Sequence, residues 1–255
     1  MFSTVKVNFS MAKQNYSKNI VDSLSRMACS HGGETVFRDW CECMALSFAN
    51  ACDLLHGENW QERERTYKRI ISQYTKQEVD LFVRMMADLT NLFEQDMFYD
   101  HLGRIYMEAF GGNKNLGQCF TPMSLCQAMS EITVKEHKSN ERMTVCDPAC
   151  GGGATLIATA GVMHRDGIDY QRRVVFYGTD LDKLCVHMCY VQMCMIGANA
   201  VITRGDTLSL KVFDVFRTTP VFIFDPLTIP DTDNKQSEII KEETVKSECK
   251  QLSLF

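Results

Sequence analysis

A glycine-rich loop in the second half of the chain has residue types that could hold a nucleotide-type cofactor. Val145 to Ala154 reads Val-Cys-Asp-Pro-Ala-Cys-Gly-Gly-Gly-Ala, a short extended run that ends at Asp147 and leads through a glycine turn into a helix. Consecutive glycines let the backbone approach a ligand that a Cβ atom would keep away. The spacing is not the G-x-G-x-x-G of dinucleotide-binding folds, and the Lys-Ser/Thr of a phosphate loop is missing, so neither a dehydrogenase nor an NTPase is indicated.

Two further acidic residues follow later extended runs. Asp180 ends the run from Tyr177, and Asp206 lies in the segment Arg-Gly-Asp-Thr-Leu that closes the next one. Ligands of open α/β sheets bind where the carboxyl ends of the strands meet. There, Asp180 can accept hydrogen bonds from a ribose diol, and Asp206 can accept one from an adenine amino group. Each acid alone is weak evidence, but three at successive strand ends predict a site for a ribose- and adenine-containing cofactor.

A fourth motif lies upstream, at Gly117 to Pro122, and reads Gly-Gln-Cys-Phe-Thr-Pro. By itself it also suits an ordinary helix start, with Thr121 as the cap and Pro122 in the first turn. Followed by Asp-Pro-Ala-Cys-Gly-Gly-Gly, Gly-Thr-Asp-Leu-Asp and Gly-Asp-Thr-Leu, it resembles the modification subunit of type I restriction systems and related N6-adenine DNA methylases. The similarity covers roughly residues 100–225. It implies a DNA methyltransferase that uses S-adenosylmethionine and has a Rossmann-like α/β fold behind an N-terminal helical domain.

The resemblance also implies a role for each motif. Thr121 and Pro122 would line the methionine end of S-adenosylmethionine, Asp147 and Gly151 would belong to the loop that contacts it through the backbone, and Asp180 and Asp206 would bind ribose and adenine. The candidate cofactor-binding residues are Phe120, Thr121, Pro122, Asp147, Pro148, Ala149, Gly151, Gly153, Asp180, Leu181, Asp206 and Thr207.

The catalytic motif departs from the family pattern. Relatives carry Asn-Pro-Pro-Phe or Asp-Pro-Pro-Tyr after the fourth strand, where the amide or acid accepts a hydrogen bond from the target amino group and the ring stacks on a flipped base. Alignment on the preceding Phe-Asp-Val selects Thr-Pro-Val-Phe at residues 219–222, whereas strand order selects Asp-Pro-Leu-Thr at 225–228. The candidate catalytic residues are therefore Thr219, Pro220, Phe222, Asp225 and Pro226.

Neither segment preserves the whole motif, and only a short tail follows in place of a target-recognition region. The hypothesis is an adenine-N6 DNA methyltransferase that is impaired or depends on a partner such as a specificity subunit, from a bacterium, a phage or a mobile element. The alternative is a non-catalytic accessory protein that binds the cofactor and is recruited to replicating DNA.

The pattern of apolar residues predicts where the elements lie. From about Ser17 to Phe110 these residues recur at helical spacing, and the sign-mixed segment 61–69 is interpreted as a solvated helix face. Beyond Gly111, strands are expected at residues 143–146, 174–177, 200–202 and 221–224, and helices at 124–132, 155–164 and 181–195. This alternation predicts a parallel sheet covered on both faces. The predicted units are an N-terminal segment (residues 1–16), a helical domain (17–110), a cofactor-binding domain (111–230) and a flexible tail (231–255).

The composition of the chain bears on DNA binding, membrane association and metal binding. A net charge of −5 argues against DNA binding through the overall charge of the protein. Contact with DNA would therefore be confined to a local surface or be provided by a partner protein. No apolar run approaches the roughly 20 residues of a membrane span, and no secretion signal is evident, so a cytoplasmic location is expected. The 12 cysteines lack Cys-x-x-Cys pairs, which favours reduced buried thiols and no metal site.

The last five residues are Gln251, Leu252, Ser253, Leu254 and Phe255. They resemble the pentapeptide by which bacterial replication and repair proteins dock on the sliding clamp, and they follow a charged stretch that suits a tether. The competing interpretation is a hydrophobic C-terminus that folds back on its own core. A clamp tether would raise the local concentration of an acidic protein at newly replicated DNA.

Overall fold

The structure is a computed structural model that describes residues 15–53, 56–111, 121–135, 142–218 and 251–253. The helices of the N-terminal part are α1 (Tyr16–His31), α2 (Gly33–Cys52), α3 (Glu58–Ile71), α4 (Lys76–Gln95) and α5 (His101–Phe110). The helices of the second part are α6 (Met123–Lys135), α7 (Ala154–Arg165), α8 (Tyr170–Arg173) and α9 (Lys183–Met195). The strands are β1 (Met143–Asp147), β2 (Val174–Asp180), β3 (Ala200–Asp206), β4 (Lys211–Arg217) and β5 (Gln251–Ser253).

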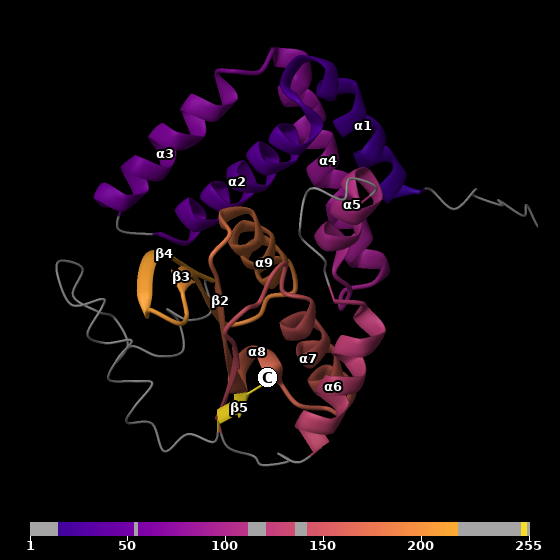
Figure 1. Cartoon of the computed structure of the whole chain (residues 1–255), viewed down its shortest axis with the longest axis vertical. Coiled ribbons are helices and arrows are strands. Elements are labelled where there is room, and N and C mark those ends of the chain that lie inside the picture. Colours follow the sequence, from indigo (N-terminus) through magenta and orange to yellow (C-terminus); the bar gives the residue numbers. More distant parts are fainter. Residues whose placement is uncertain (1–14, 54–55, 112–120, 136–141, 219–250, 254–255) are drawn as a thin grey trace, which may run out of the picture.

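The N-terminal helices pack around two buried aromatic residues of α2. Phe37 contacts the ring of Tyr106 on α5 at a centroid distance of 5.6 Å, and the indole of Trp40 donates a hydrogen bond to the carbonyl oxygen of Phe82 on α4 at 3.2 Å. Helix α2 also packs on α9, which joins the helical part to the sheet (Figure 1). By contrast, α3 pairs its own charges at the surface, as in Lys68 with Glu64 at 3.2 Å, and therefore presents the solvated face that its sequence predicts.

The second part is a five-stranded sheet in the order β4-β3-β2-β1-β5. Strands β1, β2, β3 and β5 are parallel, whereas β4 pairs antiparallel with β3. The first three predicted strands are confirmed, but the prediction of a wholly parallel sheet is wrong at β4. Only four residues separate β3 from β4, which is too short for a crossover helix, so β4 returns as a hairpin. The strand expected at residues 221–224 lies outside the described residues.

One face of the sheet is covered by two helices of this part, α7 and α9. Phe216 of β4 meets the ring of His187 on α9 at 5.4 Å, and Phe216 pairs across the sheet with Ile202. Ile202 pairs in turn with Gly178, where a Cβ atom would meet Leu156 of α7 at 3.1 Å. Helices α7 and α9 therefore cover the same face, as Figure 1 shows.

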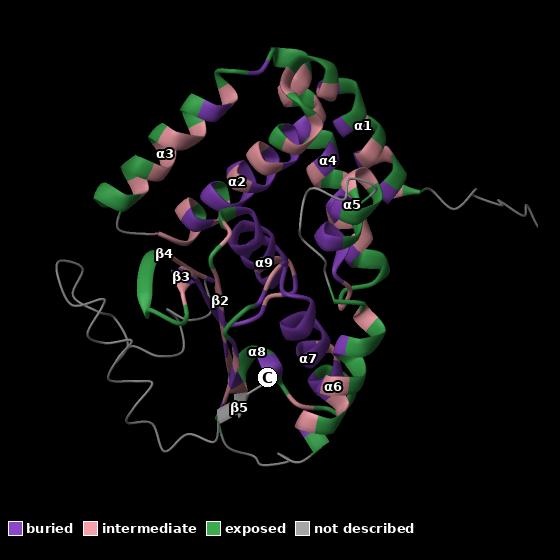
Figure 2. Cartoon of the chain, viewed as in Figure 1, coloured by how far each residue is buried: buried purple, intermediate pink, exposed green. Residues whose placement is uncertain are grey.

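The two faces differ in burial. Residues that point toward α7 and α9 are almost fully buried, whereas those at the alternating positions of β1 and β2 are only half-buried (Figure 2). A parallel sheet with helices on both faces would bury both sets. The described residues therefore show helical cover on one face, and cover of the other face stays a prediction. The buried set is Met143, Val145, Val174, Phe176, Ala200 and Ile202.

Strand β5 lies on the free edge of β1, with Leu252 opposite Val145. Its three residues belong to the segment that was predicted to be a flexible tail, so that prediction is corrected for them. A C-terminus that folds back on its own core is the competing interpretation of this segment. No helix among the residues described is long and apolar enough to cross a membrane.

Candidate functional site

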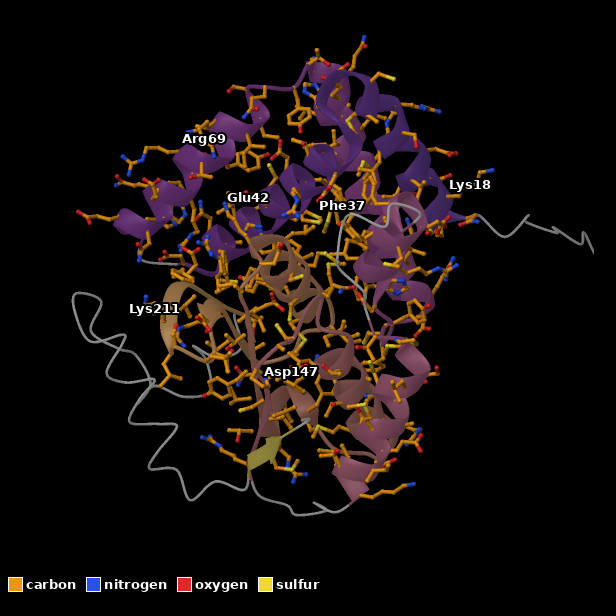
Figure 3. All side chains as sticks on the ribbon, viewed as in Figure 1. Lys18, Phe37, Glu42, Arg69, Asp147 and Lys211 are labelled. Carbon is orange, nitrogen blue, oxygen red and sulfur yellow. The ribbon has the colours of Figure 1, made fainter. Side chains whose placement is uncertain are left out.

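Three carboxylates gather at one edge of the sheet. Asp147, Asp180 and Asp206 are the last residues of β1, β2 and β3, which are neighbouring parallel strands. Parallel strands end at the same edge, so three acids that are far apart in the sequence lie around one position. Helix α7 begins beside Asp147 at this edge (Figure 3).

The glycine loop turns at this edge through conformations that favour glycine. Gly151 has φ 52° and Gly153 has φ 95°, and Gly153 is the N-cap of α7. A Cβ atom on Gly153 would also lie 2.9 Å from the sulfur of Cys189 on α9. Both the backbone and the space therefore require glycine at residue 153. The loop delivers the amino-terminal end of α7, which attracts negative groups such as a carboxylate, to the carboxyl edge of the sheet.

The buried carboxylate of Asp147 stabilises the conformation of the loop. It is 2% exposed, one carboxylate oxygen accepts a hydrogen bond from the backbone N–H of Ala149 at 3.0 Å, and the other accepts from the hydroxyl of Thr155 on α7. Burial raises the pKa of this carboxyl, and the two hydrogen bonds oppose that shift. Because the carboxylate of Asp147 points into the protein, it stabilises the conformation of the loop. The loop residues available to contact a ligand are Pro148 and Ala149, which are exposed.

Asp180 joins the second strand to the same loop. One oxygen accepts a hydrogen bond from the backbone N–H of Gly151 at 2.9 Å, and the other accepts from the N–H of Asp182 at 2.8 Å. The N–H of Cys150 also donates to the carbonyl of Thr179 at 3.0 Å. The side chain of Asp180 is half-buried, so its oxygens lie beside the loop and within reach of solvent.

The end of β3 also contacts the glycine loop. The hydroxyl of Thr207 donates to the carbonyl of Pro148 at 2.7 Å, which links this strand end to the loop. Asp206 accepts hydrogen bonds from the hydroxyl of Ser209 and from the backbone N–H groups of Leu208 and Ser209, and these bonds lower its pKa. Asp206 is therefore a stable anion that holds the hairpin turn while remaining partly exposed.

The upstream motif reaches the loop through α6. Cys126 on α6 packs against Ala154, the first residue of α7, and its N–H donates to the carbonyl of Pro122 at 3.2 Å. This chain of contacts places the exposed Thr121 and Pro122 near the start of α7. Phe120 lies outside the described residues.

The exposed groups at this edge suit S-adenosylmethionine. Asp180 offers acceptors for a ribose diol, and the adjacent Leu181 is 64% exposed, which leaves an apolar side chain for the face of an adenine ring. Acidic side chains at Asp180 and Asp206 complement a cationic sulfonium group. The residues at this edge are therefore chemically compatible with the ribose, the adenine ring and the positively charged sulfonium of S-adenosylmethionine.

Gln192 of α9 was missed by the sequence reasoning. It is fully buried, and its amide nitrogen donates to the carboxylate of Asp100 at 2.7 Å and to the carbonyl of Gly152 in the loop at 2.8 Å. Its amide oxygen accepts from the N–H of Leu102 on α5 at 3.0 Å. Gln192 thus ties the glycine loop to the helical domain. The signal in the sequence was a single amide within a mostly apolar helix.

Replacing Gln192 with leucine is expected to lower the free energy of unfolding by about 3 kcal/mol and to weaken cofactor binding about tenfold. The change removes one of the two hydrogen-bond donors to Asp100 and the Gln192 partners of Gly152 and Leu102, while leucine fills a similar volume. Urea denaturation and calorimetry with S-adenosylmethionine measure the two effects. Gln61→Leu, at an exposed position of α3, is the matched control. Wild-type stability in the Gln192 variant would show that the network is dispensable.

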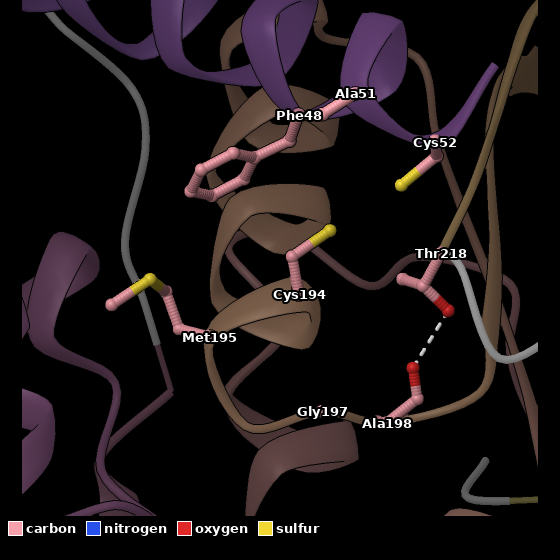
Figure 4. A pocket seen from close by; sticks show the side chains of 8 residues that line it. All are labelled: Phe48, Ala51, Cys52, Cys194, Met195, Gly197, Ala198 and Thr218. Atoms are coloured by element: carbon pink, nitrogen blue, oxygen red, sulfur yellow. Dashed lines mark hydrogen bonds between the residues drawn. The ribbon is translucent and has the colours of Figure 1, made fainter. Parts of the chain in front are cut away.

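A pocket of about 230 Å³ lies away from this edge, between the C-terminal ends of α2 and α9 (Figure 4). Thr218 contributes a hydroxyl group to the pocket lining, and this hydroxyl donates a hydrogen bond to the carbonyl oxygen of Ala198 at 2.7 Å. The pocket has no charged side chain, and it is close to the amino ends of the strands. It is therefore separate from the carboxylate site. It is lined by Phe48, Ala51, Cys52, Cys194, Met195, Gly197, Ala198 and Thr218.

The five candidate catalytic residues, at positions 219 to 226, lie outside the described residues. Their relation to the three carboxylates therefore stays a prediction. In the described part of the chain, no cluster of three or more His, Cys, Asp or Glu side chains could hold a metal ion.

Comparison with known proteins identifies the family. No curated protein gives a significant match to this sequence. Three solved structures share similarity over 76% of this chain. A methyltransferase subunit of a type I restriction-modification system from Streptococcus thermophilus is 14% identical with a TM-score of 0.42. A modification subunit assigned to a type I restriction enzyme from Vibrio vulnificus YJ016 is 12% identical with a TM-score of 0.48. A protein assigned as a class I S-adenosylmethionine-dependent methyltransferase from Listeria monocytogenes is 15% identical with a TM-score of 0.43.

These matches cover 58%, 56% and 54% of the respective chains, so the present chain spans little more than half the length of the structures it resembles. The model of the N-6 DNA Methylase family matches residues 97–243, which include the glycine loop and the ends of β1 to β3. The chain therefore belongs to the N-6 DNA methylase family, with an α/β methyltransferase sheet behind a helical N-terminus and S-adenosylmethionine as its cofactor.

Proposed function

We propose that this protein is a DNA methyltransferase that transfers a methyl group to the N6 amino group of adenine. The observation that carries the proposal is the junction at the sheet edge, where Asp180 accepts a hydrogen bond from Gly151 of the loop and lies between Asp147 and Asp206. Family membership supports the same reaction class.

Each residue at the edge has a distinct proposed role. Asp180 binds the ribose hydroxyls, Asp206 accepts from the adenine amino group of the cofactor, and Asp147 holds the loop in shape. Thr121 and Pro122 line the methionine end. The bound cofactor supplies an electrophilic methyl group on a sulfonium sulfur.

The acceptor that receives the target base is proposed to be Asp225 or Thr219. Either side chain would accept a hydrogen bond from the adenine amino group and direct the nitrogen lone pair at the methyl carbon. In this transfer a new N–C bond would form as the S–C bond breaks, the sulfur would keep the electron pair of that bond as a neutral thioether, and the amino proton would pass to solvent. A flipped base brings the nitrogen within reach of the methyl group.

Two alanine variants separate the possible acceptors. With radiolabelled S-adenosylmethionine and unmethylated DNA, we expect one of Asp225→Ala and Thr219→Ala to lose about 100-fold in rate, because the other position lies away from the amino group. Thr232→Ala, outside both candidate motifs, is the control. Full activity in both variants would exclude both residues as the acceptor.

A partner is proposed to assist DNA binding. The net charge of −5 disfavours tight binding of DNA by this chain alone, and a specificity subunit would supply the missing contacts. We also propose docking of residues 251–255 on a sliding clamp, which requires Gln251–Ser253 to leave the edge of β1. Equal clamp binding by the full chain and by a chain ending at residue 250 would contradict this docking.

The altered catalytic motif favours a second candidate function. Neither Asn-Pro-Pro-Phe nor Asp-Pro-Pro-Tyr occurs in the sequence, so the chain could bind the cofactor and recruit other proteins without methylating DNA. Calorimetric binding of S-adenosylmethionine without methyl transfer, tested with and without partner subunits, would favour this accessory role. Methyl transfer by the purified protein would reject it.

A further inference from the structure

Two ion pairs join α2 of the helical domain to the start of α9. Nη1 of Arg38 lies 3.7 Å from Oδ1 of Asp182, and Nζ of Lys183 lies 2.6 Å from Oε1 of Glu42. Arg38 and Glu42 are one helical turn apart, so they lie on the same side of α2, which packs on α9. The order of charges on α2 therefore matches the order of the opposite charges at the start of α9.

Asp182 also orients the carboxylate at the end of β2. Its backbone N–H donates to one oxygen of Asp180 at 2.8 Å. Its side chain is the N-cap of α9 and accepts hydrogen bonds from the N–H groups of Leu184 and Cys185 at 2.7 Å and 3.3 Å. The side chain of Asp182 thus fixes the first turn of α9, while its backbone holds Asp180. A shift of Asp182 would move the N–H group on which the orientation of Asp180 depends.

Arg38 is held in place for this contact by its own helix. Oε1 of Glu34 accepts hydrogen bonds from Nε and Nη2 of Arg38 at 3.1 Å and 3.0 Å. These bonds fix the plane of the guanidinium group, and the third nitrogen, Nη1, is the one that lies toward Asp182. A planar group oriented in this way loses little further freedom when it attracts a carboxylate.

Helix α9 contacts the glycine loop as well. The amide of Gln192 donates to the carbonyl of Gly152 at 2.8 Å, and the sulfur of Cys189 lies where a Cβ atom on Gly153 would meet it at 2.9 Å. The position of α9 therefore affects the loop at these two points and Asp180 at a third. Contacts that fix the start of this helix fix the geometry of the cofactor site.

We propose that Arg38 of the helical domain is a positioning residue for the cofactor site, acting through Asp182 on the carboxylate of Asp180. This role rests on the proposed binding of the ribose hydroxyls by Asp180, and it makes the affinity for the cofactor depend on the helical domain. The side chains of Arg38 and Asp182 are 40% and 33% exposed, so solvent screens their attraction. The expected effect of Arg38 is therefore a moderate change in affinity.

Calorimetry on the full chain tests this role with two ligands, S-adenosylhomocysteine and its 2′,3′-dideoxy analogue. We expect Arg38→Gln to bind S-adenosylhomocysteine about fivefold more weakly than the wild type. Affinity for the analogue should be unchanged, because it has no ribose hydroxyl to donate to Asp180. An equal loss for both ligands would show a general loosening of the site and would overturn the positioning role.

Two further variants test whether the charge of Arg38 is responsible. Arg38→Lys keeps a positive charge beside Asp182 and should bind S-adenosylhomocysteine within about twofold of the wild type. Arg69→Gln, at an exposed position of α3, makes the same change in net charge as Arg38→Gln and should have wild-type affinity. A lysine variant as weak as the glutamine variant would contradict a role for the charge.

A double-mutant cycle tests the route through Asp182. Asp182→Asn keeps the backbone N–H and a side-chain oxygen that can cap α9, but it removes the charge that attracts Arg38. In the Arg38→Gln background it should cause no further loss of affinity, because the same interaction is already missing. Additive losses would show that Arg38 acts by another route.

Asp180→Asn separates this inference from the proposed site. Wild-type affinity for S-adenosylhomocysteine in Asp180→Asn would remove the ribose-binding role itself. Weakened binding in Asp180→Asn together with wild-type affinity in Arg38→Gln would overturn the role of Arg38 alone. These measurements do not depend on methyl transfer.

Discussion

Replacing Asp180 with asparagine is expected to weaken the binding of S-adenosylmethionine by about 100-fold. In the proposed site, both ribose hydroxyls donate to this carboxylate, and hydrogen bonds to a charged group contribute about 1.5–3 kcal/mol each. Asparagine has only one acceptor oxygen in its side chain. In the protein without ligand, the backbone N–H groups of Gly151 and Asp182 already donate to the two carboxylate oxygens of Asp180, so no side-chain acceptor is left for the ribose. The charge that complements the sulfonium is lost as well. Isothermal titration calorimetry of the purified variant measures the effect.

The control for this variant is Asp80→Asn. Asp80 is an exposed acid on α4, remote from the sheet edge, and the substitution makes the same change in net charge. We expect wild-type affinity in the control and a circular dichroism spectrum in both variants that matches the wild type. A dissociation constant for Asp180→Asn within twofold of the wild type would remove Asp180 from the cofactor site.

Acidification is expected to destabilise the protein through His187. This histidine of α9 is 2% exposed against Phe216, and burial lowers its pKa from 6.5 to about 3. A histidine whose folded pKa is lowered contributes stability above its unfolded pKa and loses that contribution as the pH falls toward the folded value. The window therefore runs from pH 6.5 to about 3. At pH 5 the loss amounts to about 2 kcal/mol, since each pKa unit corresponds to about 1.4 kcal/mol.

The variant His187→Leu isolates this contribution. Leucine fills the site without a titrating group, so urea denaturation should show a smaller loss of stability between pH 7.5 and pH 5 than in the wild type. Buried Asp100 and Asp147 have raised pKa values and act with the opposite sign, but they are present in both proteins and cancel in the comparison. Parallel pH profiles for wild type and His187→Leu would refute the assignment.

Much of the fold follows from local pattern. The predicted strands at 143–146, 174–177 and 200–202 and the helices at 155–164 and 181–195 agree with the observed elements to within a few residues at their ends. Short apolar runs between glycine turns have few alternatives when they alternate with helical periodicity. The order of the parallel strands then brings their carboxyl ends to one edge, so the gathering of Asp147, Asp180 and Asp206 could be predicted as well.

Side-chain roles within that edge required the structure. The sequence places Asp147 in the loop, but its inward orientation depends on Thr155, eight residues later on another element. The role of Gln192 depends on Asp100 and Leu102, about 90 residues away. Contacts over such separations leave no periodic signal in a single sequence.

Strand pairing was also decided by the tertiary structure. The pattern of Lys211–Arg217 resembles that of any half-exposed strand, and its antiparallel pairing follows from the short turn that joins it to β3. The C-terminal residues suit both a tether and an edge strand, and their pairing with β1 depends on which edge of the assembled sheet is available. The sequence by itself determined which residues form elements and in what order the strand-end acids meet, because these are local and topological properties. The tertiary structure alone decided the strand partners and the direction of each buried polar group, because both depend on contacts between residues remote in the chain.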